Sequence, residues 1–160
     1  MLNIKSTLQY YHNMSFFQQI STRSTSINSL LCIGLDPHLS ELKLPSTTST
    51  TEEERANAAY EFCARIINAT HDHAVCYKPN VAFFEAIGTK LGMVTLRKVV
   101  DDISKHNIPI LLDVKRGDIG STANAYADAC YDDECGLNGD GVTLSPLMGW
   151  DSVQPFVTGE

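Results

Sequence analysis

Four short apolar runs, each ending in polar or charged residues, constrain the fold of this chain more than any other feature. They cover residues 30–35, 74–77, 108–112 and 141–144. Near-continuous apolar strands that alternate with helical segments are typical of a parallel sheet whose faces are both covered. The sequence therefore predicts an α/β fold in which these four runs are parallel strands.

The segments between the predicted strands have the signals of helices. Thr51 and Glu54 have the spacing of a capping box, and apolar residues recur at helical spacing from there to about residue 70. Residues 81–106 are helical in pattern with a break near 88–92, and the Ala-rich residues 121–131 predict another helix. A further helix is predicted to begin at Val153.

The residues at the strand ends distinguish between two parallel folds. Each predicted strand leads into polar residues, namely Asp36, Lys78, Asp113 with Lys115, and Ser145. In β/α barrels this rim builds the active site, whereas an open doubly wound sheet binds its ligand mainly at one crevice. The sequence contains no G-x-G-x-x-G or Walker pattern. We therefore predict a (β/α)8 TIM barrel, here incomplete at about four βα units.

The third strand carries the charges of greatest interest. Side chains two apart on a strand share a face, so Asp113 and Lys115 point the same way. Lys78 ends the neighbouring strand, and Asp118 follows three residues after Lys115. A surface ion pair is the simpler interpretation of an isolated D-x-K triplet. With Lys78 on the next strand, we instead expect two lysines and two aspartates to share one concave space.

This segment resembles the signature of the orotidine 5′-phosphate decarboxylase family, D-x-K-x-x-D-I followed by a Thr. Residues 113–123 read DVKRGDIGSTA, and residues 35–37, 77–85 and 142–149 match further family segments in the same order. The resemblance covers about residues 15–157. It implies an N-terminal extension at 1–14 and the N-terminal part of the family's barrel at 15–160.

The resemblance also implies roles for individual residues. Lys115 is expected to protonate C6 of the pyrimidine as CO₂ leaves, with Asp113 against the substrate carboxylate. Lys78 and Asp118 complete an alternating array of charges. Further contacts to the substrate are expected from Asp36, Asn80, Thr122 and Ser145.

The implied reaction is the cofactor-independent decarboxylation of orotidine 5′-phosphate to UMP in de novo pyrimidine biosynthesis, with no metal. The implied assembly is a homodimer in which Asp118 and Thr122 reach the neighbouring subunit's ligand. In the family, the phosphate-binding residues come from later strands. A half barrel would also leave two parallel edge strands unpaired. We therefore expect this chain, expressed alone, to be poorly soluble or to self-associate, and to lack measurable decarboxylase activity.

Two alternatives remain open on the sequence. One is a metal-dependent sugar-phosphate decarboxylase or aldolase that shares the D-x-K-x-x-D strand. The other is a non-catalytic barrel fragment that serves as an interaction module. Lys78-Pro79-Asn80 and the residues after Asp118 favour the pyrimidine enzyme.

The net charge and the hydropathy of the chain limit the classes of partner it can have. The formal net charge of −7 argues against a broad nucleic-acid surface, although a local lysine cluster can still bind a small anion. No run approaches the ~18 apolar residues of a membrane span. We expect a cytoplasmic protein. An organelle-targeting N-terminus is the alternative, since residues 1–35 contain no Asp or Glu, and Met14 is a second candidate start.

The five cysteines are odd in number and form no C-x-x-C pair, which predicts free thiols rather than a disulfide framework. His71 and His73 form an H-x-H sequence. We interpret them as polar residues at a helix end, with a pair of metal ligands as the alternative.

Overall fold

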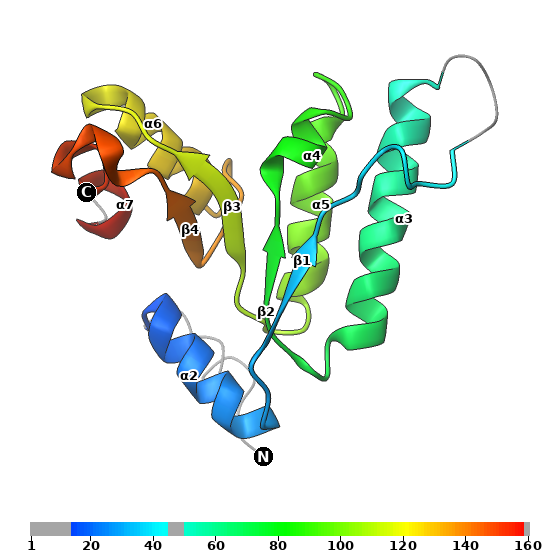
Figure 1. Ribbon diagram of the computed structural model, residues 1–160, viewed down its shortest axis with the longest axis horizontal. Coiled ribbons are helices and arrows are strands. Elements are labelled where there is room, and N and C mark those ends of the chain that lie inside the picture. The colour runs from blue at the N-terminus through cyan, green and yellow to red at the C-terminus, as the bar shows by residue number, and fades with distance from the viewer. Residues whose placement is uncertain (1–13, 45–49, 159–160) are drawn as a thin grey trace.

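The computed structural model describes residues 14–44 and 50–158, and four parallel strands form its centre (Figure 1). Most of the predicted N-terminal extension, residues 1–13, lies outside the described residues. The elements follow in the order α2 (Phe16–Ile27), β1 (Leu31–Leu35), α3 (Glu52–Thr70), β2 (Ala74–Pro79), α4 (Val81–Glu85), α5 (Gly92–Ser104), β3 (Leu111–Arg116), α6 (Gly120–Tyr131), β4 (Gly141–Leu144), the 3₁₀ turns Pro146–Met148 and Trp150–Ser152, and α7 (Gln154–Thr158).

The strands lie side by side in the order of the sequence. β1 pairs with β2 in parallel, with Gly34 opposite Lys78, and β3 pairs with β4 in parallel. Bridges from Tyr77 to Ile110 and from Asn80 to Asp113 join β2 to β3. A doubly wound sheet reverses its strand order at a switch point, whereas a barrel keeps the order of the chain. The described strands therefore form part of a β/α barrel, as predicted.

Helix α3 begins as the sequence predicts. The Thr51 hydroxyl accepts a hydrogen bond from the Glu54 amide at 3.2 Å, and the Glu54 carboxylate accepts one from the Thr51 amide at 2.8 Å. This reciprocal capping box satisfies two amides that the first turn would otherwise leave unpaired. The Glu52 carboxylate accepts from the amides of Lys90 and Leu91, at 2.7 and 2.5 Å, so the start of α3 also orders the loop before α5.

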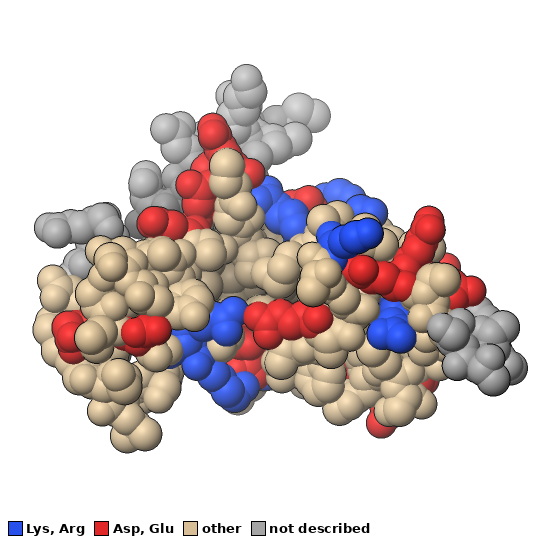
Figure 2. Space-filling view, turned by 90° about the horizontal axis from the view of Figure 1, so that it is seen from above, with Lys and Arg blue, Asp and Glu red and all other residues tan. Residues whose placement is uncertain are grey.

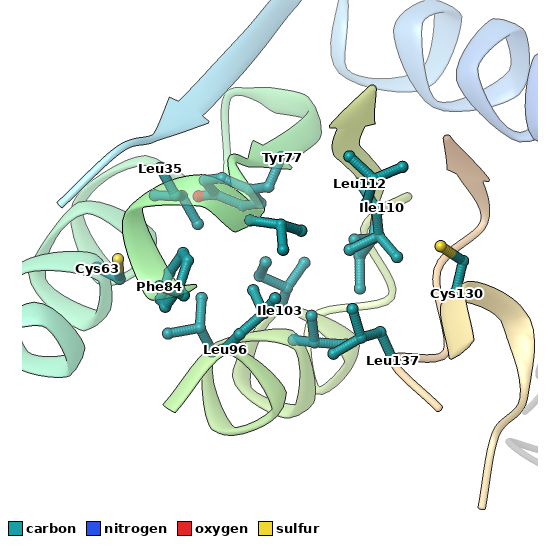
Figure 3. Packing of buried hydrophobic residues seen from close by; sticks show 14 of the residues in the cluster. Leu35, Cys63, Tyr77, Phe84, Leu96, Ile103, Ile110, Leu112, Cys130 and Leu137 are labelled. Carbon is teal, nitrogen blue, oxygen red and sulfur yellow. The ribbon is translucent and has the colours of Figure 1, made fainter. Parts of the chain in front are cut away.

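The hydrophobic core lies between the strands and their covering helices (Figure 3). Leu35, Tyr77 and Leu112 alternate toward this side of the strands and are completely buried. They meet apolar side chains of α3, α4 and α5, among them Cys63, Ile67, Phe84, Leu96 and Ile103. Because strand side chains alternate between faces, Cys32, Lys78 and Asp113 lie on the opposite face, which is the interior side of the barrel.

Helix α2 was not predicted. Arg23 on this helix donates to the carbonyls of Ala74 and His71, both at 2.8 Å, and Gln19 donates to Asp140 at 3.2 Å. These contacts attach α2 to the beginnings of β2 and β4, at the end of the strands opposite the charged rim. None of its residues is buried, and its local signal, the capping box formed by Ser15 and Gln18, was missed.

The predicted third strand starts later than its apolar run suggests. Regular β3 begins at Leu111, although Ile108 and Ile110 are buried, because Pro109 has no amide to donate to a ladder.

All five cysteines are free thiols, as predicted.

The His71 ring packs against the His106 ring at 4.3 Å. Among the described residues, no three His, Cys, Asp or Glu side chains gather as potential metal ligands. Within the same residues, no helix combines the length and apolar character needed to cross a bilayer.

Candidate active site

Lys78, Asp113 and Lys115 meet where β2 and β3 end. The Asp113 carboxylate accepts a hydrogen bond from Lys78 Nζ on Oδ2 at 2.8 Å. Its Oδ1 accepts one from Lys115 Nζ at 2.5 Å. The register explains the meeting, because the bridge between Asn80 and Asp113 sets the end of β2 beside the middle of β3. The structure therefore brings together three of the four charged residues that the sequence singled out.

The three side chains differ in their access to solvent. The Asp113 side chain is 7% exposed, that of Lys78 is 31% exposed and that of Lys115 is 69% exposed. Burial by itself raises the pKa of Asp113, but the hydrogen bonds from Lys115, Lys78 and Thr143 outweigh it and hold the pKa well below its ordinary value. Burial lowers the pKa of Lys78, and Asp113 more than reverses this, so the net shift is upward. Asp113 and Lys78 are both charged at neutral pH.

Thr143 on β4 is a member of this cluster that the sequence analysis missed. Its hydroxyl donates to Asp113 Oδ1 at 2.8 Å and accepts from the Lys115 amide at 3.1 Å. The sequence contained a signal for this role, because Thr143 lies two residues before Ser145, a predicted rim residue, and residues two apart on a strand share a face. The contact holds the Lys115 backbone, whose φ of 46° lies in the left-handed region. That conformation costs a residue with a Cβ about 1–2 kcal/mol.

Asp36 and Asn80 lie at the same rim. A Cβ atom on Gly34, which pairs with Lys78, would come within 2.6 Å of Asp36 Oδ2, so the Asp36 carboxylate folds back over this glycine. Its charge contributes to the raised pKa of Lys78, after the larger effects of burial and Asp113. Asn80 accepts a hydrogen bond from the Ala82 amide at 3.3 Å and thereby caps α4.

Asp118, Thr122 and Ser145 lie outside the cluster of Lys78, Asp113, Lys115 and Thr143. Asp118 accepts from the amide of its neighbour Ile119 at 2.8 Å, and it makes no ion pair with another residue in the described ranges. Thr122 is exposed in the first turn of α6. Ser145 donates its backbone amide to the Arg116 carbonyl at 2.7 Å, which joins the ends of β4 and β3.

Viewed from above, toward the ends of the strands, acidic and basic side chains lie side by side across the middle of the molecule (Figure 2). An anion bound here meets fixed positive charge from two lysines and negative charge from a buried aspartate. Such a site stabilises charge that develops near Lys115 and repels charge placed near Asp113.

These features define a β/α-barrel protein whose strand-end rim carries lysine and aspartate charges in alternation. Residues 29–159 match the family model described as the orotidine 5′-phosphate decarboxylase / HUMPS family. The chain belongs to this family.

Curated relatives agree with this assignment. The chain is 47% identical over 144 residues to an orotidine 5′-phosphate decarboxylase of Herpetosiphon aurantiacus, covering 89% of this chain and 49% of the relative. It is 44% identical over 146 residues to one of Leptospira interrogans, covering 90% of this chain and 50% of that protein. The chain thus spans about half the length of the curated relatives it matches.

Solved structures have the same fold. An OMP decarboxylase of Leishmania donovani aligns with a TM-score of 0.72 and 43% identity, over 91% of this chain and 50% of that one. A UMP synthase of the same organism aligns with a TM-score of 0.73 and 42% identity, over 91% of this chain and 28% of that one.

Proposed function

We propose that this chain supplies the charged centre of a cytoplasmic enzyme that decarboxylates orotidine 5′-phosphate to UMP in pyrimidine biosynthesis without a cofactor. The observation that carries the proposal is the buried carboxylate of Asp113 held between Lys78 and Lys115, at 2.8 and 2.5 Å. The names of the curated relatives support the choice of substrate.

The chemistry requires stabilisation of a poorly delocalised carbanion. When CO₂ leaves C6 of the pyrimidine, negative charge develops at that carbon. Lys115 has the most exposed side chain of the charged residues in the cluster, so its ammonium would stabilise this charge and donate the proton to C6. At an effective dielectric of 20, two unit charges 4 Å apart interact by about 4 kcal/mol. A few charges fixed before the reaction therefore lower the barrier substantially.

Asp113 would act on the ground state. The substrate carboxylate would lie against it, and the repulsion would be relieved as the carboxylate leaves as neutral CO₂. This requires Asp113 to stay ionised, and its strongly lowered pKa meets that requirement. Lys78 and Thr143 hold it in place. The repulsion between Asp113 and the substrate carboxylate would be stronger in the bound substrate than in the transition state. Relief of this repulsion would lower the barrier, because a site accelerates a reaction when it favours the transition state over the substrate.

The other rim residues would position the nucleotide. Asp36 and Asn80 lie beside Lys78 and would contact the ribose hydroxyls. Ser145, next to the end of β3, would contact the pyrimidine. Such remote contacts help to hold the reacting ring in its strained environment.

We also propose a homodimer in which Asp118 and Thr122 serve the neighbouring site. Ile119, which follows Asp118 and lies three residues before Thr122, is 52% exposed although apolar. Leu147 and Trp150, on the loop after β4, are 93% and 64% exposed. The two loops are adjacent, since a Cβ on Gly117 would lie 2.9 Å from Ser145. Exposed apolar residues gathered beside a functional rim favour a protein partner, and a second copy would bring Asp118 toward a second ligand.

A chimaeric barrel tests the function directly. Residues 29–159 replace the matching segment of the Herpetosiphon aurantiacus relative, and UMP formation from orotidine 5′-phosphate is measured alongside the 160-residue chain alone. We expect turnover by the chimaera, persistence in EDTA, and a loss of at least ~100-fold in Lys115→Met, in the range that a general acid contributes. Calorimetry with a 6-substituted UMP analogue reports binding by the same variants.

Three outcomes would contradict the proposal. A folded chimaera without activity would favour a non-catalytic role for these residues. Activity abolished by EDTA and restored by a divalent cation would favour the metal-dependent sugar-phosphate chemistry. Unchanged turnover in Lys115→Met would remove this lysine from the reaction.

A further inference from the structure

Two cysteine side chains face each other across the first pair of strands. Cys32 on β1 and Cys76 on β2 are register partners, and their Sγ atoms lie 3.1 Å apart. Cys32 is exposed, whereas Cys76 is only 5% exposed. The other cysteines, Cys63, Cys130 and Cys135, make no thiol–thiol contact with any cysteine in the described ranges. This pairing therefore depends on the register of β1 and β2.

The distances suit a bridge between the two residues. Paired strands lie about 4.8 Å apart, and a disulfide joins residues whose Cα atoms are roughly 4.4–6.8 Å apart. A bond of about 2.05 Å requires the sulfurs to approach by about 1 Å more. The strand pairing is irregular between Leu31 and Cys32. The small movement would therefore fall where the ladder is already interrupted.

We propose that Cys32 and Cys76 are a reversible oxidation site, which a peroxide converts into an intrachain disulfide between β1 and β2. In the first step, the exposed Cys32 sulfur takes an oxygen from the peroxide and becomes a sulfenic acid. For hydrogen peroxide, the other product is water.

In the second step, the Cys76 sulfur attacks the Cys32 sulfur. The hydroxyl group leaves with the Cys76 proton as a second water. The two thiols are thereby oxidised by two electrons and the peroxide is reduced by two. Burial, together with the Cys32 contact, raises the pKa of Cys76 to about 12. Because Cys32 is exposed and Cys76 is buried, Cys32 is the thiol that meets the oxidant first.

The position of the bridge relates it to the charged rim. Gly34 and Lys78 form the register pair two residues further along the same strands, so their side-chain positions share the face of Cys32 and Cys76. The disulfide would lie one step below Lys78. It would close a loop between residues 44 apart in sequence and tie β1, an edge strand among the described strands, to its neighbour.

Peptide mapping of the 160-residue chain tests the proposal without any activity measurement. The reduced protein is treated with a small excess of hydrogen peroxide, alkylated and digested with trypsin. Trypsin does not cut before Pro79, so Cys32 is on peptide 24–43 and Cys76 is on peptide 66–90. We expect these two peptides to be linked in most of the oxidised protein and to separate again after treatment with dithiothreitol.

Variants show whether the link depends on the fold. Cys32→Ser and Cys76→Ser should each abolish it, whereas Cys135→Ser, which removes an exposed thiol elsewhere, should leave it unchanged. In 8 M urea the preference for this pair should fall at least tenfold relative to other pairings.

Three results would overturn the proposal. The first is oxidation of Cys32 beyond the sulfenic acid while Cys76 remains a free thiol that can be alkylated. The second is a Cys32 disulfide between two copies, seen as a dimer on a non-reducing gel. The third is equal yield of the link in native buffer and in urea.

Discussion

The hydroxyl of Thr143 donates a hydrogen bond of 2.8 Å to Oδ1 of Asp113, from a strand that contributes no charged residue to the cluster. The same hydroxyl accepts the Lys115 amide at 3.1 Å. Thr143 thus connects the buried carboxylate to the backbone of the lysine that approaches it. The arrangement of Lys78, Asp113 and Lys115 therefore depends on β4 as well as on β2 and β3.

Replacing Thr143 with Val should destabilise the chain by about 1–3 kcal/mol, because a buried carboxylate loses a donor and the Lys115 amide loses its acceptor. Urea unfolding measures the loss. Thr143→Ser keeps the hydroxyl and should retain most of the stability. A larger loss in Thr143→Ser than in Thr143→Val would show that the methyl group, not the hydroxyl, matters.

The stability of the chain should fall in acid partly through Asp113. Its pKa in the folded chain lies well below the ordinary value of 3.8. A group whose pKa is lowered by folding contributes stability above its unfolded pKa and loses it as the pH falls toward the folded pKa. The contribution should be fully present at pH 6 and should decline below about pH 4.

Asp113→Asn provides the comparison for this pH dependence. Free energies of unfolding measured from pH 7 to pH 3 should decline less steeply in the variant than in the parent chain. Parallel curves for the two proteins would mean that other carboxylates account for the acid sensitivity. Asp101, which pairs with Arg97 on the exposed face of α5, offers a matched control as Asp101→Asn.

Two substitutions at Lys115 separate its backbone strain from its charge. Lys115→Ala and Lys115→Gly both remove the ammonium, but only glycine adopts a φ of 46° without a Cβ penalty. The glycine variant should therefore be more stable than the alanine variant by about 1 kcal/mol, the reverse of the usual order within a strand. Thermal or urea unfolding decides between them. A more stable alanine variant would mean that this backbone conformation is not retained in solution.

The exposed apolar residues after β4 should support self-association. Leu147→Ser combined with Trp150→Ser should weaken association at least tenfold in sedimentation velocity, because about 1.4 kcal/mol of lost apolar contact produces that change. Val94→Ser, which alters a 49% exposed apolar residue on α5, is the control. An equal effect of the control would indicate nonspecific association, and no effect of the double variant would place the interface elsewhere.

Local patterns predicted most of the secondary structure. The capping box at Thr51 and the helical spacing of apolar residues gave the bounds of α3, and the polar residues after each apolar run marked the rim. Helix α2 was missed although Ser15 and Gln18 form a capping box at its start, and the contacts of Arg23 and Gln19 that hold it reach residues distant in sequence. The alternation of strand residues placed Lys78 and Asp113 on one face, whereas Lys115 stands at an irregularity of β3, with a φ of 46°, and its contact with Asp113 follows from the tertiary structure.

The amino-acid sequence by itself determined the four strands, the helices from α3 onward, their order and the family, because helix and strand periods and strand-end motifs are local properties of a chain. Only the tertiary structure decided that Asp113 joins both lysines and Thr143, that Asp118 stands apart from them, and that Cys32 meets Cys76. Each of these outcomes depends on the register between strands. That register is set by packing across the whole sheet, and no single segment contains it.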